Sequence, residues 1–213
     1  MNESGYEIIA NCGHDIGIDF TSSEMAELAF KNNMSEKSIE DITCVFTYLS
    51  DKKNRAVIET CLRLSRLPSK EPKTFEGFDF TRIHGDSVEQ LINLPSLSAL
   101  YSRNNMAFIG PQGVGKTHLA MAFGTKVCEA GMKTYFLKAT ELNQKMINAR
   151  KFGKIDSLIK SMVKPSCLII DEIGRCIFDR ESTGLFFDMI DRRYEKEGAN
   201  CMIFTSKIGR AHV

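Results

Sequence analysis

The segment GPQGVGKT, residues 110–117, constrains the fold more than any other stretch of this sequence. Its glycines let the backbone turn tightly and point successive N–H groups at one place, where phosphate oxygens can bind. Lys116 adds a mobile cation, and Thr117 adds a hydroxyl that can ligate Mg²⁺. An apolar run at 106–109 precedes the segment, and apolar residues at helical spacing follow it. Strand, loop and helix form the context that this motif requires, so the sequence predicts a phosphate-binding loop.

A second motif, CLIIDE at residues 167–172, predicts a buried parallel strand that ends in two acidic residues. We expect Asp171 to hold Mg²⁺ through water and Glu172 to polarise the attacking water as a general base. The alternative is an ordinary strand followed by an acidic turn, and the phosphate loop upstream makes that alternative weaker. An Asp-Glu pair favours hydrolysis over phosphorylation of a small molecule.

The composition is that of a globular protein with one main domain and an appendage: 43% of the 213 residues are apolar and 26% are charged. The net charge of +1 gives no global attraction to nucleic acid or membrane. No apolar run approaches the length of a membrane span, and the seven cysteines include no C-x-x-C pair. We therefore expect a cytoplasmic protein with reduced thiols and no membrane partner.

The chain is expected to have three parts. Residues 1–68 form a helical N-terminal region, 69–100 a linker and entry segment, and 101–213 the nucleotide-binding core. Within the first part we expect an irregular start over 1–34 with one short helix at 23–31. A long amphipathic helix follows, which either packs on its own domain or offers a surface for self-assembly or a partner. Three aromatic residues are expected to anchor the linker on the core: Phe75, Phe78 and Phe80.

Strands and helices are expected to alternate after residue 100. This pattern predicts an α/β, three-layer fold with a mostly parallel sheet, whose ligands bind at the carboxyl ends of the strands. Both nucleotide motifs fall at such ends. The expected strands are 106–109, 134–137, 167–171 and 201–205, and the expected helices are 117–130, 140–150, a second one ending near 162, and 185–195.

Several segments in this order resemble one family: GPQGVGKTHLA, KPSCLIIDEIG, FFDMIDRRYE and MIFTS. They are similar to the AAA+ ATPases that assist insertion-sequence transposases, the IstB-like proteins, and to the related DnaC-like helicase loaders. The resemblance implies a P-loop NTPase (AAA+) domain that uses ATP and Mg²⁺ and works as a homo-oligomer on DNA. It implies delivery of a transposase to its target or, alternatively, of a replicative helicase to an origin.

The resemblance also implies roles for single residues. Thr117 and Asp171 would hold Mg²⁺, while Glu172 and Lys116 would be the catalytic residues. The nucleotide would be bound by the whole loop and the histidine after it, that is by Gly110, Pro111, Gln112, Gly113, Val114, Gly115, Lys116, Thr117 and His118.

Segment 138–164 carries seven basic residues against two acidic ones. A surface that contacts double-stranded DNA through its phosphates requires a basic cluster, and this one lies near the nucleotide site. Such binding falls steeply with salt. The alternative is a solvated helical face. Phe152 is the single aromatic residue in this segment, too few for interleaved base stacking, so sequence-independent backbone contact is favoured. The candidate DNA-binding residues are Lys145, Arg150, Lys151 and Lys154.

The last residues depart from the family pattern. Where the family usually has Asn after the fourth strand, this chain has Lys207, and nothing like the family's fifth strand, trans-acting arginine or lid follows. We expect a C-terminal truncation, with 207–213 as a candidate non-native segment, and therefore weak ATP binding and poor hydrolysis. Lys207 could pair with the acidic residues and compete with Mg²⁺. Arg192 and Arg193 could reach a neighbouring subunit or form a solvated helix end.

Four functions are compatible with these residues: a transposition helper ATPase, a helicase loader, a small-molecule kinase and a non-catalytic interaction module. The Asp-Glu pair and the basic segment disfavour the kinase. Glu172→Gln separates the first function from the last, because it should trap ATP-bound oligomers only where ATP is hydrolysed.

Overall fold

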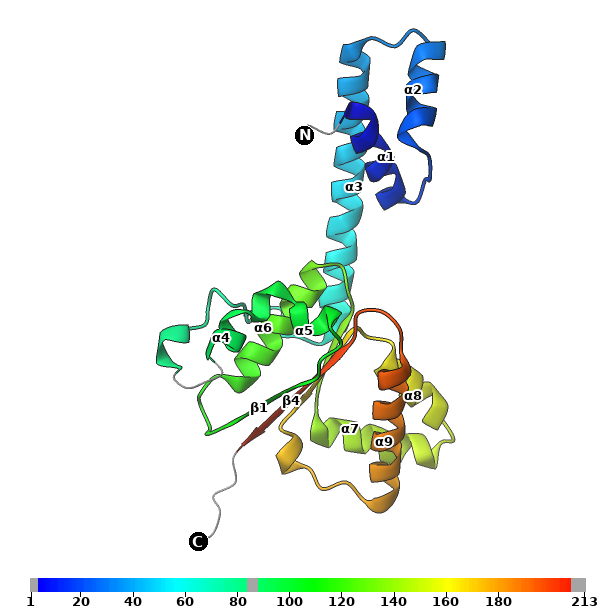
Figure 1. The fold of residues 1–213 in the computed structure, drawn as a ribbon. Coiled ribbons are helices and arrows are strands. Elements are labelled where there is room, and N and C mark those ends of the chain that lie inside the picture. The colour runs from blue at the N-terminus through cyan, green and yellow to red at the C-terminus, as the bar shows by residue number, and fades with distance from the viewer. Residues whose placement is uncertain (1–3, 84–87, 208–213) are drawn as a thin grey trace. The chain divides into compact units, whose positions relative to one another are not determined.

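The chain divides into two compact units, Met1–Glu59 and Thr60–Val213 (Figure 1). The computed structural model describes residues 4–83 and 88–207. No helix in this part of the chain is long and apolar enough to cross a membrane. The three-part division at residues 68 and 100 remains our proposal.

The first unit contains α1 (Gly5–Ile16), α2 (Ser22–Lys31) and most of α3 (Glu36–Ser65). The expectation of an irregular start was wrong, because residues 5–16 form a helix. The missed signal is a pair of capping boxes, in which a hydroxyl residue and a glutamate three positions later satisfy each other's backbone N–H groups. These pairs are Ser4 with Glu7 and Thr21 with Glu24.

A small apolar core holds the first unit together. It is made by one face of each helix, and the central residues are almost completely buried. They are Ile9, Met25, Ala29 and Ile39.

The second unit is built on a four-stranded parallel sheet with the order β1-β4-β3-β2. The predicted fold class is therefore confirmed. Since all strands point the same way, their carboxyl ends meet at one edge of the sheet. The strands are β1 (Met106–Gly110), β2 (Thr134–Lys138), β3 (Cys167–Asp171) and β4 (Cys201–Lys207).

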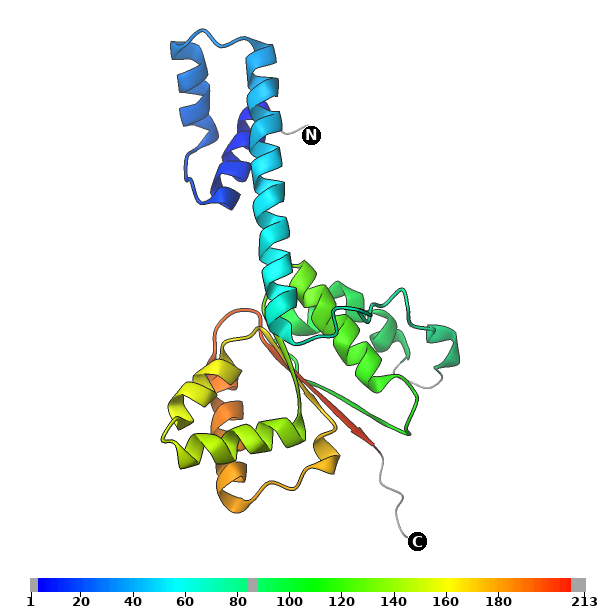
Figure 2. The ribbon, with the colours of Figure 1, turned by 180° about the vertical axis from the view of Figure 1, so that it is seen from behind.

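Helices cover both faces of the sheet (Figure 2). Alternate residues of a strand point to opposite faces, so Ile169 of β3 joins the core under α6, while Leu168 and Ile170 join the core under α7, α8 and α9. All five residues of β3 are buried, as expected for a central parallel strand. These helices are α6 (Lys116–Glu129), α7 (Ala139–Lys151), α8 (Ile155–Val163) and α9 (Arg180–Glu195).

Three helix starts differ from the prediction. α6 and α7 each begin one residue earlier than predicted, at Lys116 and Ala139. α9 begins at Arg180, earlier than predicted, because the Asp179 side chain accepts a hydrogen bond from the Ser182 N–H and caps the helix. Short elements complete the unit: η1 (Phe80–Arg82), α4 (Val88–Ile92), η2 (Leu94–Ser96), α5 (Ser98–Tyr101) and η3 (Ile173–Arg175).

The linker packs on the core as expected. Phe75 is buried in the cluster under α6, and Phe78 and Phe80 pack against the same cluster. The rings of Phe78 and Phe80 meet edge to face with centroids 4.9 Å apart. These contacts place the linker beside the start of α6.

Arg193 is completely buried at the amino ends of the strands, so the expectation that it forms a solvated end or reaches a neighbour was wrong. Its Nη1 donates to the carbonyls of Met162 and Pro165 at 2.9 Å, and its Nη2 donates to Asn200 Oδ1 at 2.6 Å and to the Cys201 carbonyl at 2.9 Å. Burial lowers the pKa of Arg193 to about 10. The side chain ties α9 to the segments that lead into β3 and β4. Arg192 is half-exposed and pairs with Asp188 at 2.9 Å and with Asp156 at 3.1 Å.

Candidate active site

The predicted phosphate loop connects β1 to α6 at the carboxyl edge of the sheet. Gly113 and Gly115 adopt φ values of 86° and 89°, in the left-handed region that favours glycine. A Cβ on Gly115 would lie 2.4 Å from the Phe78 ring, so both the backbone conformation and the linker require glycine there. Gly115 is the N-cap of α6 and offers no side chain to its first turn. The amides at this helix end are therefore left for a ligand.

Lys116 curls back over the loop. Its Nζ donates to the carbonyl of Gly110 at 2.9 Å and to that of Pro111 at 2.5 Å. The ammonium group thus lies over the loop's own backbone, which places a positive charge where the loop would surround a phosphate.

Asp171 and Thr117 come together, as predicted. The Thr117 hydroxyl donates to Asp171 Oδ1 at 2.8 Å, which joins the first turn of α6 to the end of β3. The same oxygen accepts a 2.5 Å hydrogen bond from Thr205 of β4. Asp171 is only 4% exposed, so these two hydroxyls satisfy a carboxylate that burial would otherwise destabilise.

Glu172 lies next to Asp171 in a quite different environment. Its backbone is left-handed, with φ 57°, which is unusual for a residue with a side chain and concentrates at functional sites. The Glu172 N–H donates to Thr205 Oγ1 at 2.9 Å. Its carboxylate forms an ion pair with Arg175 Nη1 at 2.8 Å, and these side chains are 29% and 58% exposed. A pair this exposed typically contributes only about 0.2–1 kcal/mol.

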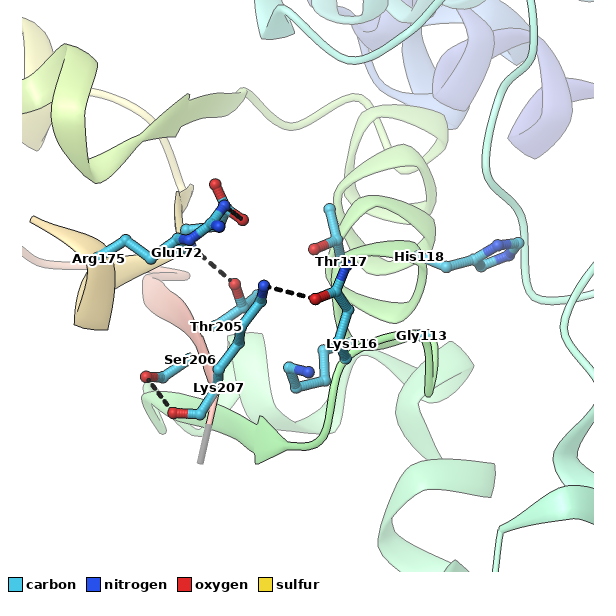
Figure 3. Close-up of a pocket in the computed structure, with 11 residues that line it drawn as sticks. Gly113, Lys116, Thr117, His118, Glu172, Arg175, Thr205, Ser206 and Lys207 are labelled. Carbon is cyan, nitrogen blue, oxygen red and sulfur yellow. Dashed lines mark hydrogen bonds and ion pairs between the residues drawn. The ribbon is translucent and has the colours of Figure 1, made fainter. Parts of the chain in front are cut away.

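Most of these residues, though not the buried Asp171, line one cleft of about 330 Å³ (Figure 3). Glu172 and Arg175 lie on one side, Lys116 and Thr117 on the other, and the end of β4 lies between them. The lining residues are Gln112, Gly113, Gly115, Lys116, Thr117, His118, Glu172, Arg175, Thr205, Ser206 and Lys207. Both predicted motifs therefore contribute to the same cavity.

Lys207 does not pair with the acidic residues, contrary to expectation. Its Nζ donates to Gln112 Oε1 at 2.8 Å, because the end of β4 lies beside the end of β1. Residues 208–213, to which the expectation of a non-native end mainly refers, lie outside the described residues.

His118 contacts the linker. One ring nitrogen, Nε2, lies 2.8 Å from the Thr74 carbonyl, and the ring centroid is 5.4 Å from that of Phe78. Figure 3 shows the ring directed away from Glu172 and Arg175. The histidine therefore fixes the linker against the first turn of α6, although it also lines the cleft.

A second, more apolar hollow of about 680 Å³ shares Gly113, Gly115 and Lys116 with the cleft. Its other walls come from the linker, β1 and the start of α6, and include Phe78, Ile83, Leu91, Val114 and Leu119. An apolar hollow that adjoins a phosphate loop suits a flat aromatic base.

The residues of the cleft can be tested for their fit to Mg²⁺. A hydroxyl and a carboxylate oxygen, from Thr117 and Asp171, are hard oxygen ligands of the kind that Mg²⁺ prefers, and they are in contact. Within residues 4–83 and 88–207, no group of three or more His, Cys, Asp and Glu side chains could hold a metal on its own. The donor set fits a metal that takes most of its ligands from phosphate and water.

The candidate DNA-binding residues lie on α7 and the turn after it. Lys151 and Lys154 are exposed and Lys145 is half-buried. Arg150 is bound to Asp179 at 2.7 Å and to Glu181 at 2.8 Å. Its charge is therefore largely compensated, and the three lysines are the better candidates for contact with phosphates.

Sequence reasoning missed Thr205 and Arg175. Thr205 is 2% exposed and bonds to both acidic residues, yet a threonine near the end of a strand carries no signal by itself. Arg175 could have been noticed from its position three residues after Glu172, a spacing at which side chains meet in a helical turn.

Comparison with known proteins gives one family. Residues 19–212 match the profile of the IstB-like ATP binding proteins. An ATP-binding protein of insertion sequence IS5376 from Geobacillus stearothermophilus is 36% identical over 173 residues, which is 81% of this chain and 67% of the relative. A counterpart from IS21 of Pseudomonas aeruginosa is 36% identical over 154 residues, 72% of this chain and 56% of the relative. The chain thus spans only part of the length of these relatives.

Among solved structures, AMPPCP-bound DnaA from Aquifex aeolicus aligns with a TM-score of 0.56 and 24% identity, covering 68% of this chain and 44% of DnaA. A replication initiator DnaA bound to AMPPCP and single-stranded DNA aligns with a TM-score of 0.54 and 26% identity, covering 68% and 44%. The fold of the second unit is therefore that of AAA+ P-loop proteins.

Proposed function

Because the chain belongs to the IstB-like ATP-binding proteins, we propose that it is an ATP-hydrolysing helper of insertion-sequence transposition. In this proposal it assembles on DNA as a homo-oligomer and delivers or activates a transposase. The observation that carries the proposal is the Thr117–Asp171 hydrogen bond, because it brings the phosphate loop and the acidic strand end to one cleft.

The loop residues Gly110 to Thr117 are assigned to the phosphates of ATP. The free amides at the start of α6 and the Lys116 ammonium supply positive charge there. In binding, Lys116 would exchange its two backbone carbonyls for phosphate oxygens, which are stronger acceptors because they are charged. The adenine base would occupy the apolar hollow between the linker and the loop.

Thr117 and Asp171 are the residues that would hold Mg²⁺. Bound there, Mg²⁺ would supply positive charge that neutralises the phosphates. Asp171 is suited to this role because pairing of β3 with β2 fixes its backbone and Thr205 fixes its carboxylate.

Glu172 is assigned to the attacking water. It differs from Asp171 in that its carboxylate faces the cleft and is held by a single exposed ion pair, so it can accept a proton without disturbing the core. Thr205 positions it through the backbone N–H.

Double-stranded DNA is the proposed partner of Lys145, Lys151 and Lys154. The support is the basic character of segment 138–164 and the exposure of two of these lysines. Backbone contact of this kind releases counterions, so DNA affinity should fall as salt rises. The relatives are proteins of insertion sequences, which favours a transposase over a replicative helicase as the protein partner.

The test is steady-state ATP hydrolysis by the purified chain with Mg²⁺, with and without duplex DNA, for the wild type and Glu172→Gln. The proposal predicts slow turnover that DNA changes, in keeping with the poor hydrolysis expected of this chain, and roughly a hundredfold slower turnover still for Glu172→Gln with ATP bound. Binding of ATP without turnover in any condition would contradict the proposed hydrolysis and favour the interaction-module alternative. Co-sedimentation of the ATP-bound variant with the transposase of the same insertion sequence tests the partner.

A further inference from the structure

We propose that Arg175 is a phosphate-binding residue of this site and a restraint on Glu172. In the structure its guanidinium holds the Glu172 carboxylate, and on nucleotide binding it exchanges that carboxylate for the terminal phosphate of ATP. The inference rests on the proposed function, because it needs a nucleotide in the cleft.

The turn that carries Arg175 is fixed, whereas its side chain is not. The Arg175 N–H donates to the Glu172 carbonyl at 2.9 Å, which closes the η3 turn. Gly174 packs so tightly on β4 that a Cβ there would lie 2.5 Å from Ser206 Oγ. The Arg175 side chain, by contrast, is 58% exposed and lines the cleft together with Lys116. A fixed turn therefore presents a movable cation to the cavity.

The contact that holds Arg175 is easily replaced. Its ion pair with Glu172 is exposed, and exposed pairs are weak. A terminal phosphate carries more negative charge than a carboxylate and offers three oxygens, which the planar guanidinium can contact through two parallel N–H donors. Exchange of the carboxylate for the phosphate is thus favourable in the same cavity.

The exchange changes what Glu172 can do. While it is paired, the carboxylate is occupied by the guanidinium and is a poor acceptor for a proton from water. Once Arg175 has turned to the phosphate, the carboxylate is free. Because the new contact is to the terminal phosphate of ATP, ADP does not release Glu172, and the site distinguishes the two nucleotides.

The other two cations of the cleft have different partners. Lys116 donates to backbone carbonyls of the loop, and Lys207 donates to the Gln112 side-chain carbonyl. Among these three cations, Arg175 alone is paired with Glu172, the predicted general base. Its contact is therefore the one that links nucleotide binding to the general base.

The experiment measures the equilibrium affinities of the full chain for ATP and ADP with Mg²⁺, by fluorescence of labelled nucleotides. Arg175→Ala should weaken ATP binding about tenfold, because a charge-assisted contact is lost, and change ADP binding less than twofold. Arg175→Lys should fall in between, since lysine lacks the planar fork. Lys126→Ala is the matched control, because Lys126 forms an exposed i,i+3 ion pair with Glu129 outside the cleft.

Glu172→Gln provides a second measurement. It removes the charge that holds Arg175. The gain in ATP affinity caused by Glu172→Gln should therefore be several-fold larger when Arg175 is present than in the Arg175→Ala background. Equal gains in both backgrounds, or ATP affinity unchanged by Arg175→Ala, would overturn the inference and leave the proposed function intact. Failure of the wild type to bind either nucleotide would overturn both. Circular dichroism confirms folding, and Arg175→Gln replaces the alanine variant if that variant is unfolded.

Discussion

The two ends of the sheet each carry an arginine, and the two are held in opposite ways. At the amino ends, Arg193 has no exposed surface and donates to backbone carbonyls and to Asn200. At the carboxyl ends, Arg175 is largely exposed and is held by Glu172. A side chain with many buried partners is costly to move, and one with a single exposed partner is not. The comparison indicates that the side-chain contacts at the amino end of the sheet are fixed, whereas those at the carboxyl end can rearrange.

Removal of the buried arginine should have the largest effect. Arg193→Met leaves several buried carbonyls without donors, so we expect a loss of about 3–5 kcal/mol in the free energy of unfolding. Urea denaturation followed by circular dichroism measures it. Arg192→Met on the same helix, which removes a half-exposed arginine, is the control and should leave the unfolding midpoint nearly unchanged. Equal effects of the two variants would contradict the comparison.

At the other end, removal of a cation should affect binding and not stability. Lys116→Ala should weaken ATP affinity by roughly ten- to a hundredfold, because a charge-assisted contact to phosphate is lost. The unfolding midpoint should change little, since the bond of Lys116 to Pro111 is exposed and the one to Gly110 is only part-buried. A large loss of stability would show that the carboxyl end is as rigid as the amino end.

Thr205 is a fixed side chain at the carboxyl end of the sheet. Thr205→Val keeps the shape but removes the donor to Asp171 and the acceptor for the Glu172 N–H, so it should cost about 1–3 kcal/mol of stability. It should also slow any ATP turnover, because both acidic residues lose a positioning contact. Thr205→Ser retains the hydroxyl and should restore both properties. Failure of serine to do so would mean that the methyl group, and not the hydroxyl, is what matters.

The smallest effect is expected for the exposed ion pair near the start of α9. The Arg150 guanidinium, and after it the Ser182 N–H, lower the pKa of Asp179 well below its usual value. Because the folded-state pKa lies below the unfolded one, the stabilisation is present above about pH 4 and is lost as the pH falls further. Asp179→Asn should therefore be slightly less stable than wild type at pH 7, and the difference should vanish at low pH. A difference that persists at low pH would show that packing, not charge, is responsible.

The carboxyl end of the sheet was more predictable from sequence than the amino end. The phosphate loop and the acidic strand end depend on local patterns, namely glycine spacing and an apolar run that ends in Asp171 and Glu172. Their meeting follows from the rule that parallel strands end at one edge. The partner of Arg193, by contrast, is a set of carbonyls from segments distant in the chain, and no pattern in the sequence announces such a set.

In the N-terminal unit, the sequence prediction missed a helix that has a local signal. Its first helix was missed, although residues 5–16 are amphipathic and Ser4 and Glu7 form a capping box that could have revealed it. The early start of α9 was missed for a related reason, because Asp179 was not recognised as a cap. Caps depend on one or two side chains, and periodicity analysis averages over them.

The most direct test is hydrogen–deuterium exchange of the full chain with and without ATP and Mg²⁺. The account predicts slower amide exchange in peptides that cover residues 110–118 and 171–176, where the phosphates and the metal are assigned. Peptides over residues 193–201, at the fixed end of the sheet, should exchange at the same rate in both conditions. Slower exchange confined to 193–201, or none at 110–118 under saturating ATP, would contradict it.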